Sequence, residues 1–221
     1  MHIGLFGGTY NPIHLGHLRA ALEVKEGFSL DEIYFIPCAI PPHNKSGHVI
    51  GAKERYEMAR IATANTPGFL ASDVELNRSG PSYTIDTVLY FKSVLKKDTQ
   101  LYFILGLDAF LEIDTWKSYM DLFPLIPFII LTRPYAGHKD PGVRQQKIEN
   151  FIKSKISAGY KYDAAQSGFI HPEMEPVFLF NVTSLEISSS AIRSLIKKRG
   201  SIQFLVPDEV IDLIKKNGLY L

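Results

Sequence analysis

Two histidines stand three residues apart directly after a glycine-rich turn near the start of the chain, in the stretch GGTYNPIHLGH of residues 7–17. Glycines after a strand let the backbone come close to a phosphate or a sugar. Residues three apart share one face of a helix, so His14 and His17 can face the same ligand. A helix that begins here also offers unpaired backbone N–H groups and the positive end of its dipole. The stretch predicts a polyphosphate cradle, with Gly16 leaving room for the nucleotide.

Three other interpretations of this turn stay open on the residues alone. His14 and His17 have the right type for zinc ligands, although no third histidine or glutamate stands in the same segment. A dehydrogenase loop would carry the pattern G-x-G-x-x-G, which is absent. The third alternative is an ordinary strand–helix turn with incidental histidines. The joint Gly, Pro and His positions favour the polyphosphate cradle.

A second candidate anion site is the stretch ISSSAIR of residues 187–193, which follows a late strand and opens a helix. Ser188 or Ser189 can cap that helix, since serine hydroxyls accept hydrogen bonds from the first N–H groups. Arg193 adds a planar guanidinium that matches a phosphate. Taken alone, the stretch is an ordinary helix start. Beside the histidine turn, it predicts the other half of one triphosphate site.

Three further stretches have residue types that suit a nucleotide or a small phosphate. Lys45 ends the proline-stiffened loop PPHNK and can present a point charge, although a solvated loop lysine is the alternative. The stretch SGPSYTIDT of residues 79–87 is a helix start with Ser82 or Thr84 as the cap. Asp108 follows Gly106 at the end of a strand and can accept hydrogen bonds from a ribose. The single tryptophan, Trp116, suits stacking on an aromatic ring, with a core position as the alternative.

Alternating strands and helices must position these residues, because apolar runs of strand length alternate with segments of helical periodicity. This alternation predicts an α/β fold, Rossmann-like, with a doubly wound parallel sheet and helices on both faces. Ligands bind at the carboxyl ends of the strands in such sheets, where the motif-bearing loops lie. The expected strands are Ile3–Phe6, Ile33–Pro37, Leu70–Leu76, Leu101–Leu105, Phe128–Leu131 and Val177–Phe180. The expected helices are Leu15–Gly27, Ala52–Ala64, Thr84–Leu95, Ser118–Phe123, Val143–Ile156, Ser189–Lys198 and Pro207–Lys216.

The composition fits one globular domain over residues 1–221, with residues 183–221 as a C-terminal helical part. Of the 221 residues, 46% are hydrophobic and 21% are charged, which provides a core and disfavours disorder. A net charge of +1 gives no global field for a nucleic acid. One cysteine excludes a disulfide framework, and neither a signal peptide nor a membrane span is evident, so we expect a cytoplasmic protein. The polar segment Ala158–Glu175 has no clear assignment, and a homo-oligomer is neither indicated nor excluded.

The two motifs together resemble the signatures of the HxGH nucleotidyltransferase superfamily, whose second signature is I-S-S-[ST]-x-I-R. The superfamily has a Rossmann-like fold, and its histidines bind the phosphates of ATP or CTP. Within it, the stretches at Lys45, at Tyr83–Thr84, at Trp116 and at Thr132–Pro134 resemble nicotinate-mononucleotide adenylyltransferases. Asn44 interrupts the family's P-P-H-K pattern, and Tyr135 replaces its glycine. The resemblance spans nearly the whole chain and leaves only residues 137–175 unmatched.

The resemblance implies a role for each matching residue. ATP and nicotinate mononucleotide are the implied partners, and Mg²⁺ is the implied cofactor, carried on the phosphates of ATP, with no protein metal site. The catalytic residues are His14, His17 and Arg193. The ATP-binding residues are Gly8, Thr9, Tyr10, His17, Gly106, Asp108, Arg133, Ser188, Ser189 and Arg193. The mononucleotide-binding residues are Lys45, Tyr83, Thr84, Trp116 and Lys117, with the backbone N–H groups at Thr84 and Lys117 on the nicotinate carboxylate.

The implied reaction is adenylyl transfer within NAD biosynthesis, which gives deamido-NAD and pyrophosphate. A phosphate monoester is already a nucleophile, so catalysis reduces to positioning and charge stabilisation. Two alternatives remain: another small-phosphate nucleotidyltransferase, such as phosphopantetheine adenylyltransferase, and a non-catalytic nucleotide-binding module. The Tyr83 stretch and Trp116 disfavour the first, and intact His14, His17 and Arg193 disfavour the second.

Overall fold

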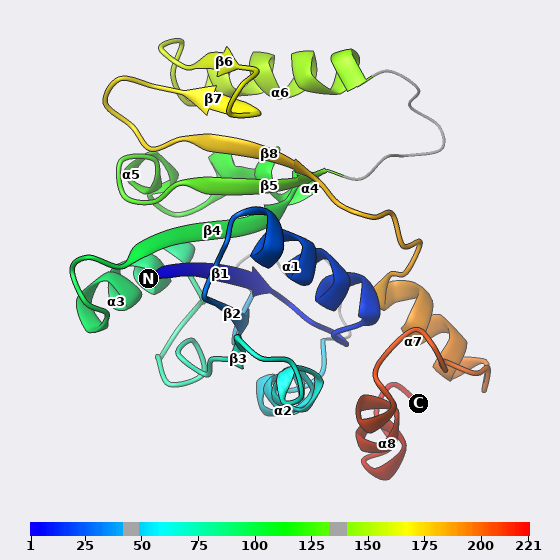
Figure 1. Cartoon of the computed structure of the whole chain (residues 1–221). Helices are drawn as coiled ribbons and strands as arrows, with labels where there is room; N and C mark the ends of the chain where they lie inside the picture. Colours follow the sequence, from blue (N-terminus) through cyan, green and yellow to red (C-terminus); the bar gives the residue numbers. More distant parts are fainter. Residues whose placement is uncertain (42–48, 133–140) are drawn as a thin grey trace. The chain divides into compact units, whose positions relative to one another are not determined.

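The computed structural model describes residues 1–41, 49–132 and 141–221. The chain divides into two compact units, shown together in Figure 1. Unit 1 contains residues 1–4 and 83–184, and unit 2 contains residues 5–82 and 185–221. A single functional domain over the whole chain stays a prediction. Strands and helices alternate in both units, and the strand pairs are mostly parallel, as the sequence indicates.

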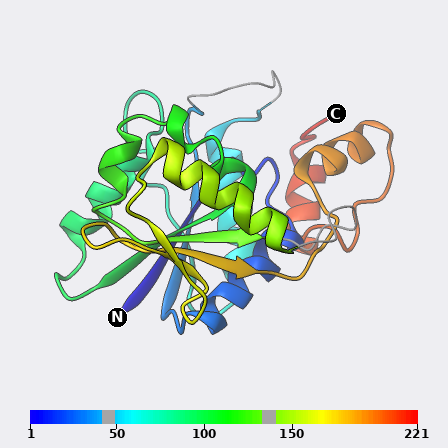
Figure 2. The same ribbon diagram turned by 90° about the horizontal axis from the view of Figure 1, so that it is seen from above.

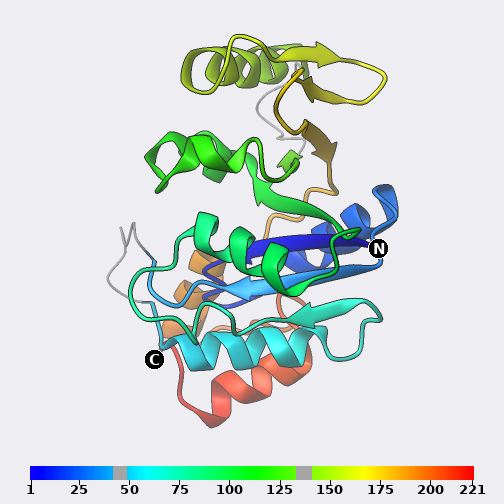
Figure 3. The same ribbon diagram turned by 90° about the vertical axis from the view of Figure 1, so that its left-hand side faces the viewer.

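Unit 2 contains the strands β2 and β3 and most of β1, in the order β3-β2-β1. The β2 and β3 strands are parallel, and Ile33 and Phe35 of β2 are fully buried. Four helices accompany them, and Figure 3 shows α2 and α8 running side by side. The strands are β1 (His2–Gly8), β2 (Glu32–Pro37) and β3 (Phe69–Ala71). The helices are α1 (Leu15–Gly27), α2 (Ala52–Thr63), α7 (Ser189–Lys197) and α8 (Asp208–Lys216).

Helix α1 forms because its small and branched apolar residues repeat at helical spacing. Ala20 and Ala21 are buried, and so is Val24, which follows them by four and three residues; Arg19 is exposed and pairs with Glu23 one turn later. The inward stripe packs the helix against the rest of unit 2 and so positions its N-terminus, where His14 is the N-cap and His17 lies in the first turn.

Unit 1 has five strands in the order β4-β5-β8-β7-β6. The β4, β5 and β8 strands are parallel, and all five residues of β5 are buried, as expected for a central strand. The β6–β7 hairpin pairs antiparallel with β8 through β7. The strands are β4 (Gln100–Gly106), β5 (Phe128–Thr132), β6 (Lys161–Asp163), β7 (Gly168–Ile170) and β8 (Val177–Asn181). The helical segments are α3 (Thr84–Val94), α4 (Leu107–Phe110), η1 (Ile113–Thr115), α5 (Tyr119–Leu122) and α6 (Pro141–Lys155).

Two expectations about the elements need correction. The predicted strand Leu70–Leu76 is only Phe69–Ala71, because the chain turns at Asp73, whose carbonyl accepts hydrogen bonds from the N–H groups of Leu76 and Asn77. The unassigned segment 158–175 contains the β6–β7 hairpin, which extends the sheet beyond β8. Within the described residues, no helix combines the length and apolar character needed to cross a membrane.

Candidate nucleotide-binding site

The turn after β1 is held by Tyr10, which adopts a left-handed backbone conformation with φ of 48°. Its buried ring folds back so that its hydroxyl donates to the Phe6 carbonyl at 2.7 Å. The ring also explains Gly8, since a Cβ at that position would lie 3.0 Å from Tyr10 Cζ. Only glycine leaves the ring undisturbed at this close approach. Thr9, between them, is exposed at the surface of the turn.

His14 and His17 form a stacked pair at the start of α1. Their ring centroids are 3.7 Å apart with an interplanar angle of 23°. The backbone N–H of His14 donates to His17 Nδ1 at 3.2 Å. A ring nitrogen that accepts a hydrogen bond carries no proton, so the proton of the neutral His17 ring lies on Nε2. This arrangement makes His17 Nε2 a hydrogen-bond donor at a helix N-terminus.

The packing around the pair fixes both rings. His14 is only 3% exposed, and a Cβ at Gly16 would lie 3.1 Å from its Nδ1 and Cε1. The Tyr10 and His17 rings meet edge to face, with centroids 5.1 Å apart. His17 is half-buried and keeps access to the surface. Gly16 is therefore needed for the packing of the two histidines. Its place between them also predicts a close approach of the nucleotide.

Two hydrogen bonds tie the second motif to the first. Arg193 Nη1 donates to the Asn11 carbonyl at 2.8 Å, and the Ser189 hydroxyl donates to the Pro12 carbonyl, also at 2.8 Å. Both motifs belong to unit 2, although about 180 residues separate them in the sequence. The structure thus brings the two turns together, as the idea of a shared triphosphate site requires.

Helix α7 begins with the cap that the sequence predicts. Ser188 Oγ accepts a hydrogen bond from the N–H of Ala191 at 3.1 Å. Arg193 Nη2 donates to Ser190 Oγ at 3.2 Å, so two of its five N–H donors have partners. The other three have no hydrogen-bond partner among the described residues. Arg193 is half-buried, which suits a group that is held on one side and binds an anion with the other.

Lys117 lies against the start of α3, where Tyr83 and Thr84 also stand. Lys117 Nζ lies 4.5 Å from the centroid of the Tyr83 ring and 3.5 Å from Asp86 Oδ2. Trp116 is half-buried, and its ring meets the edge of Phe103 at a centroid distance of 6.3 Å. A fully buried core position for the tryptophan is therefore wrong. Asp86, which pairs with Lys117, lies in the first turn of α3.

The expected cap of α3 is also wrong. Tyr83 occupies the N-cap position without a side-chain hydrogen bond. Ser82 Oγ instead accepts from the N–H groups of Ala39 at 3.0 Å and Ile40 at 3.4 Å. Thr84 is the first residue of the helix, so its N–H is one of those that an α-helix leaves without an internal partner. That position suits the predicted carboxylate contact.

The remaining predicted residues lie at strand ends or outside the described residues. Gly106 ends β4 and Asp108 follows in α4, and both are exposed at the carboxyl end of that strand. Lys45 and Arg133 lie outside the described residues. Their roles stay predictions.

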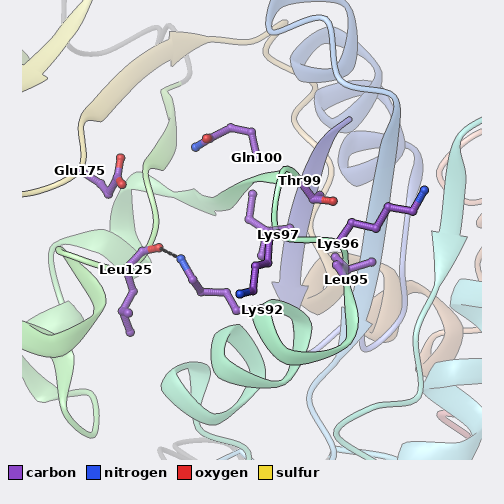
Figure 4. A pocket seen from close by; sticks show the side chains of 9 residues that line it. Lys92, Leu95, Lys96, Lys97, Thr99, Gln100, Leu125 and Glu175 are labelled. Atoms are coloured by element: carbon purple, nitrogen blue, oxygen red, sulfur yellow. Dashed lines mark hydrogen bonds between the residues drawn. The ribbon is translucent and has the colours of Figure 1, made fainter.

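A cavity of about 270 Å³ in unit 1 is separate from the predicted residues (Figure 4). It includes Gln100, the first residue of β4, and so lies at the opposite end of that strand from Gly106. Lys92 donates to the Leu125 carbonyl there at 2.8 Å. Ligands of parallel sheets bind at the carboxyl ends, so this cavity is not the candidate site. The described residues contain no group of three or more histidine, cysteine or acidic side chains that could hold a metal ion.

Comparison with known proteins identifies the family. A cytidylyltransferase-like family model matches residues 5–195. A probable nicotinate-nucleotide adenylyltransferase of Desulfatibacillum aliphaticivorans is 41% identical over 100% of both chains. One of Trichlorobacter lovleyi is 37% identical over 100% of this chain and 99% of its own. The chain belongs to the cytidylyltransferase-like family, as the nicotinate-nucleotide adenylyltransferases among its relatives indicate. The resemblance drawn from the motifs is confirmed.

Solved structures confirm the fold of this family member. The nicotinic acid mononucleotide adenylyltransferase of Plasmodium falciparum, complexed with NaAD, superposes with a TM-score of 0.69 at 22% identity. The alignment covers 99% of this chain and 97% of that one. A second structure of that enzyme, complexed with APC, gives a TM-score of 0.70, again at 22% identity, over 99% and 96% of the two chains. At such low identity the likeness supports the Rossmann-like α/β class and nothing finer.

Proposed function

We propose that this family member transfers the adenylyl group of ATP to nicotinate mononucleotide. A phosphate oxygen of the mononucleotide attacks the α-phosphorus of ATP, and the bond from that phosphorus to the β-phosphate bridging oxygen breaks. The products are deamido-NAD and pyrophosphate. The attacking phosphate is already ionised, so neither a general base nor a covalent intermediate is required. The work of the protein is to align the two phosphates and to stabilise the charge that develops.

The observation that carries the proposal is the direct bonding of the two motif turns within unit 2. Because Arg193 and Ser189 are anchored on the carbonyls of Asn11 and Pro12, the guanidinium and the histidine turn are held together. The Nε2 donor of His17, the N–H groups of Arg193 without a partner among the described residues, and the N-termini of α1 and α7 then act on one triphosphate. Magnesium would enter as part of the ATP complex and would neutralise charge on its phosphates.

The mononucleotide is held in this proposal by Tyr83, Thr84, Trp116 and Lys117. Trp116 stacks on the pyridine ring, and the N–H groups of Thr84 and Lys117 bind the carboxylate. Neutral N–H donors favour the acid over the amide, because an amide would oppose its own NH₂ to them and leave buried donors unsatisfied. A place in the cytoplasm, where ATP is abundant, completes the proposal.

The test is an assay of pyrophosphate release from ATP and Mg²⁺ with a panel of acceptors. Nicotinate mononucleotide, its amide and 4′-phosphopantetheine are each offered at equal concentration. We expect the largest kcat/KM with nicotinate mononucleotide and a dinucleotide product. Preferred use of phosphopantetheine would replace this proposal with the alternative transferase, and no release with any acceptor would favour a silent binding module.

A further inference from the structure

Arg55 of α2 is almost fully buried, with 1% of its surface exposed, and all its hydrogen bonds go to backbone carbonyls. Its Nε donates to Ile50 at 3.1 Å, and Nη1 donates to both Thr9, at 2.9 Å, and Cys38. Its Nη2 donates to Ala39 at 3.0 Å. The guanidinium therefore joins three backbone segments at one point: the turn after β1, the end of β2 and the approach to α2.

The charge of Arg55 has no ion-pair partner in the described part of the chain. A buried charge normally needs an opposite charge or a full set of hydrogen bonds. Here four carbonyl oxygens replace the carboxylate, and burial lowers the pKa of Arg55 from its ordinary value. Desolvation of the charge opposes folding, and an apolar side chain of similar size would fill the same space without that penalty. Packing alone therefore does not explain an arginine at this position.

The segments that Arg55 joins include or adjoin predicted site residues. Thr9 belongs to the turn that leads to His14 and His17, and Cys38 donates its own N–H to the Gly8 carbonyl at 2.9 Å. Ala39 and Ile40 bind Ser82, the residue before Tyr83 in the sequence. The guanidinium thus lies in a polar network that runs from the turn after β1 through Ala39 to Ser82.

We propose that Arg55 is a positioning residue for adenylyl transfer, which holds the turn after β1 against Cys38 and Ala39, the two residues that follow β2. It touches neither substrate and acts through the backbone of Thr9 and Ala39. This inference rests on the proposed function. The planar guanidinium donates to four carbonyls from three nitrogen atoms, Nε, Nη1 and Nη2. Neither a lysine ammonium nor a neutral side chain reproduces this geometry.

The test compares Arg55→Met, Arg55→Lys and Arg55→Ala with wild type, and uses Arg60→Met as the matched control. Arg60 lies on the same helix, but it is exposed and pairs with Glu57. Circular dichroism and thermal unfolding give the folded fraction and Tm, and steady-state kinetics with both substrates give kcat and KM per folded enzyme. Ethylguanidine is then added to Arg55→Ala at increasing concentration.

We expect Arg55→Met to lose on the order of 10²-fold in kcat at saturating substrates, since small misalignments have effects of this size. Arg55→Lys should lie between Met and wild type, ethylguanidine should restore part of the turnover of Arg55→Ala, and Arg60→Met should equal wild type. A folded Arg55→Met with wild-type kcat would overturn the inference, as would a lower Tm without any guanidine rescue. An inactive wild type would instead contradict the proposed function itself.

Discussion

Replacement of His17 separates two tasks that the same imidazole performs. Its Nδ1 accepts the N–H of His14, which stabilises the start of α1, and its Nε2 is the donor that we propose for phosphate. His17→Ala removes both, whereas His17→Gln keeps the first, because glutamine at the third helical position can accept the N–H of the N-cap residue. The two variants therefore give different stabilities but similar defects in turnover.

The magnitudes follow from the contacts. Loss of one exposed or half-buried hydrogen bond costs about 1 kcal/mol, so His17→Ala should stay folded with a modestly lower Tm. Loss of one donor to a developing charge costs about 2.7–4 kcal/mol, which is on the order of 10²–10³ in kcat. His17→Gln should recover the Tm and only a small part of the turnover.

The assay is pyrophosphate release under saturating ATP and nicotinate mononucleotide, with thermal unfolding of each variant measured in parallel. Recovery of full turnover by His17→Gln would show that the imidazole itself is not required, since glutamine has an acceptor oxygen and N–H donors. Retention of most turnover by a folded His17→Ala would refute the phosphate role altogether.

Three further predictions concern other residues. Trp116→Ala should raise the KM for nicotinate mononucleotide far more than the KM for ATP, and equal changes in steady-state kinetics would contradict stacking. Gly16→Ala should lower kcat, because its Cβ would lie 3.1 Å from the buried His14 ring, and unchanged kinetics would show that the ring moves freely. Burial raises the pKa of the Cys38 thiol to about 11. Only the thiolate is alkylated, so iodoacetamide labelling should be slow at pH 8 and rise steeply towards pH 11; rapid labelling of folded protein at pH 8, followed by mass spectrometry, would contradict this.

Much of the fold follows from local patterns in the sequence. Helix α1 is predictable because Leu18, Ala21 and Leu22 recur at helical spacing, and β5 because it is a continuous apolar run. The β6–β7 hairpin is not predictable in this way, since its strands are three residues long and mixed in character. Figure 2, a view from above, shows α7 beside α8, two strongly amphipathic helices that the sequence identifies.

The candidate site is predictable where a motif supplies its own geometry. The histidine turn and the Ser188 cap depend on neighbours within three residues, so their spacing is enough. Ser82 is different, because its hydroxyl binds Ala39 and Ile40, more than 40 residues away, instead of capping α3. The role of Arg55 is not predictable from the sequence either. A single arginine on a helix is usually exposed to solvent, and only the fold brings the backbone carbonyls of other segments around this one.

The central claim is that the turn after β1 and the start of α7 hold one triphosphate. A crystal structure of the chain with a non-hydrolysable ATP analogue and Mg²⁺ measures this directly. His17 Nε2 and an N–H of Arg193 should both lie within about 3 Å of phosphate oxygens of the same analogue. A triphosphate bound away from either group, in a complex that is otherwise well ordered, would contradict the claim.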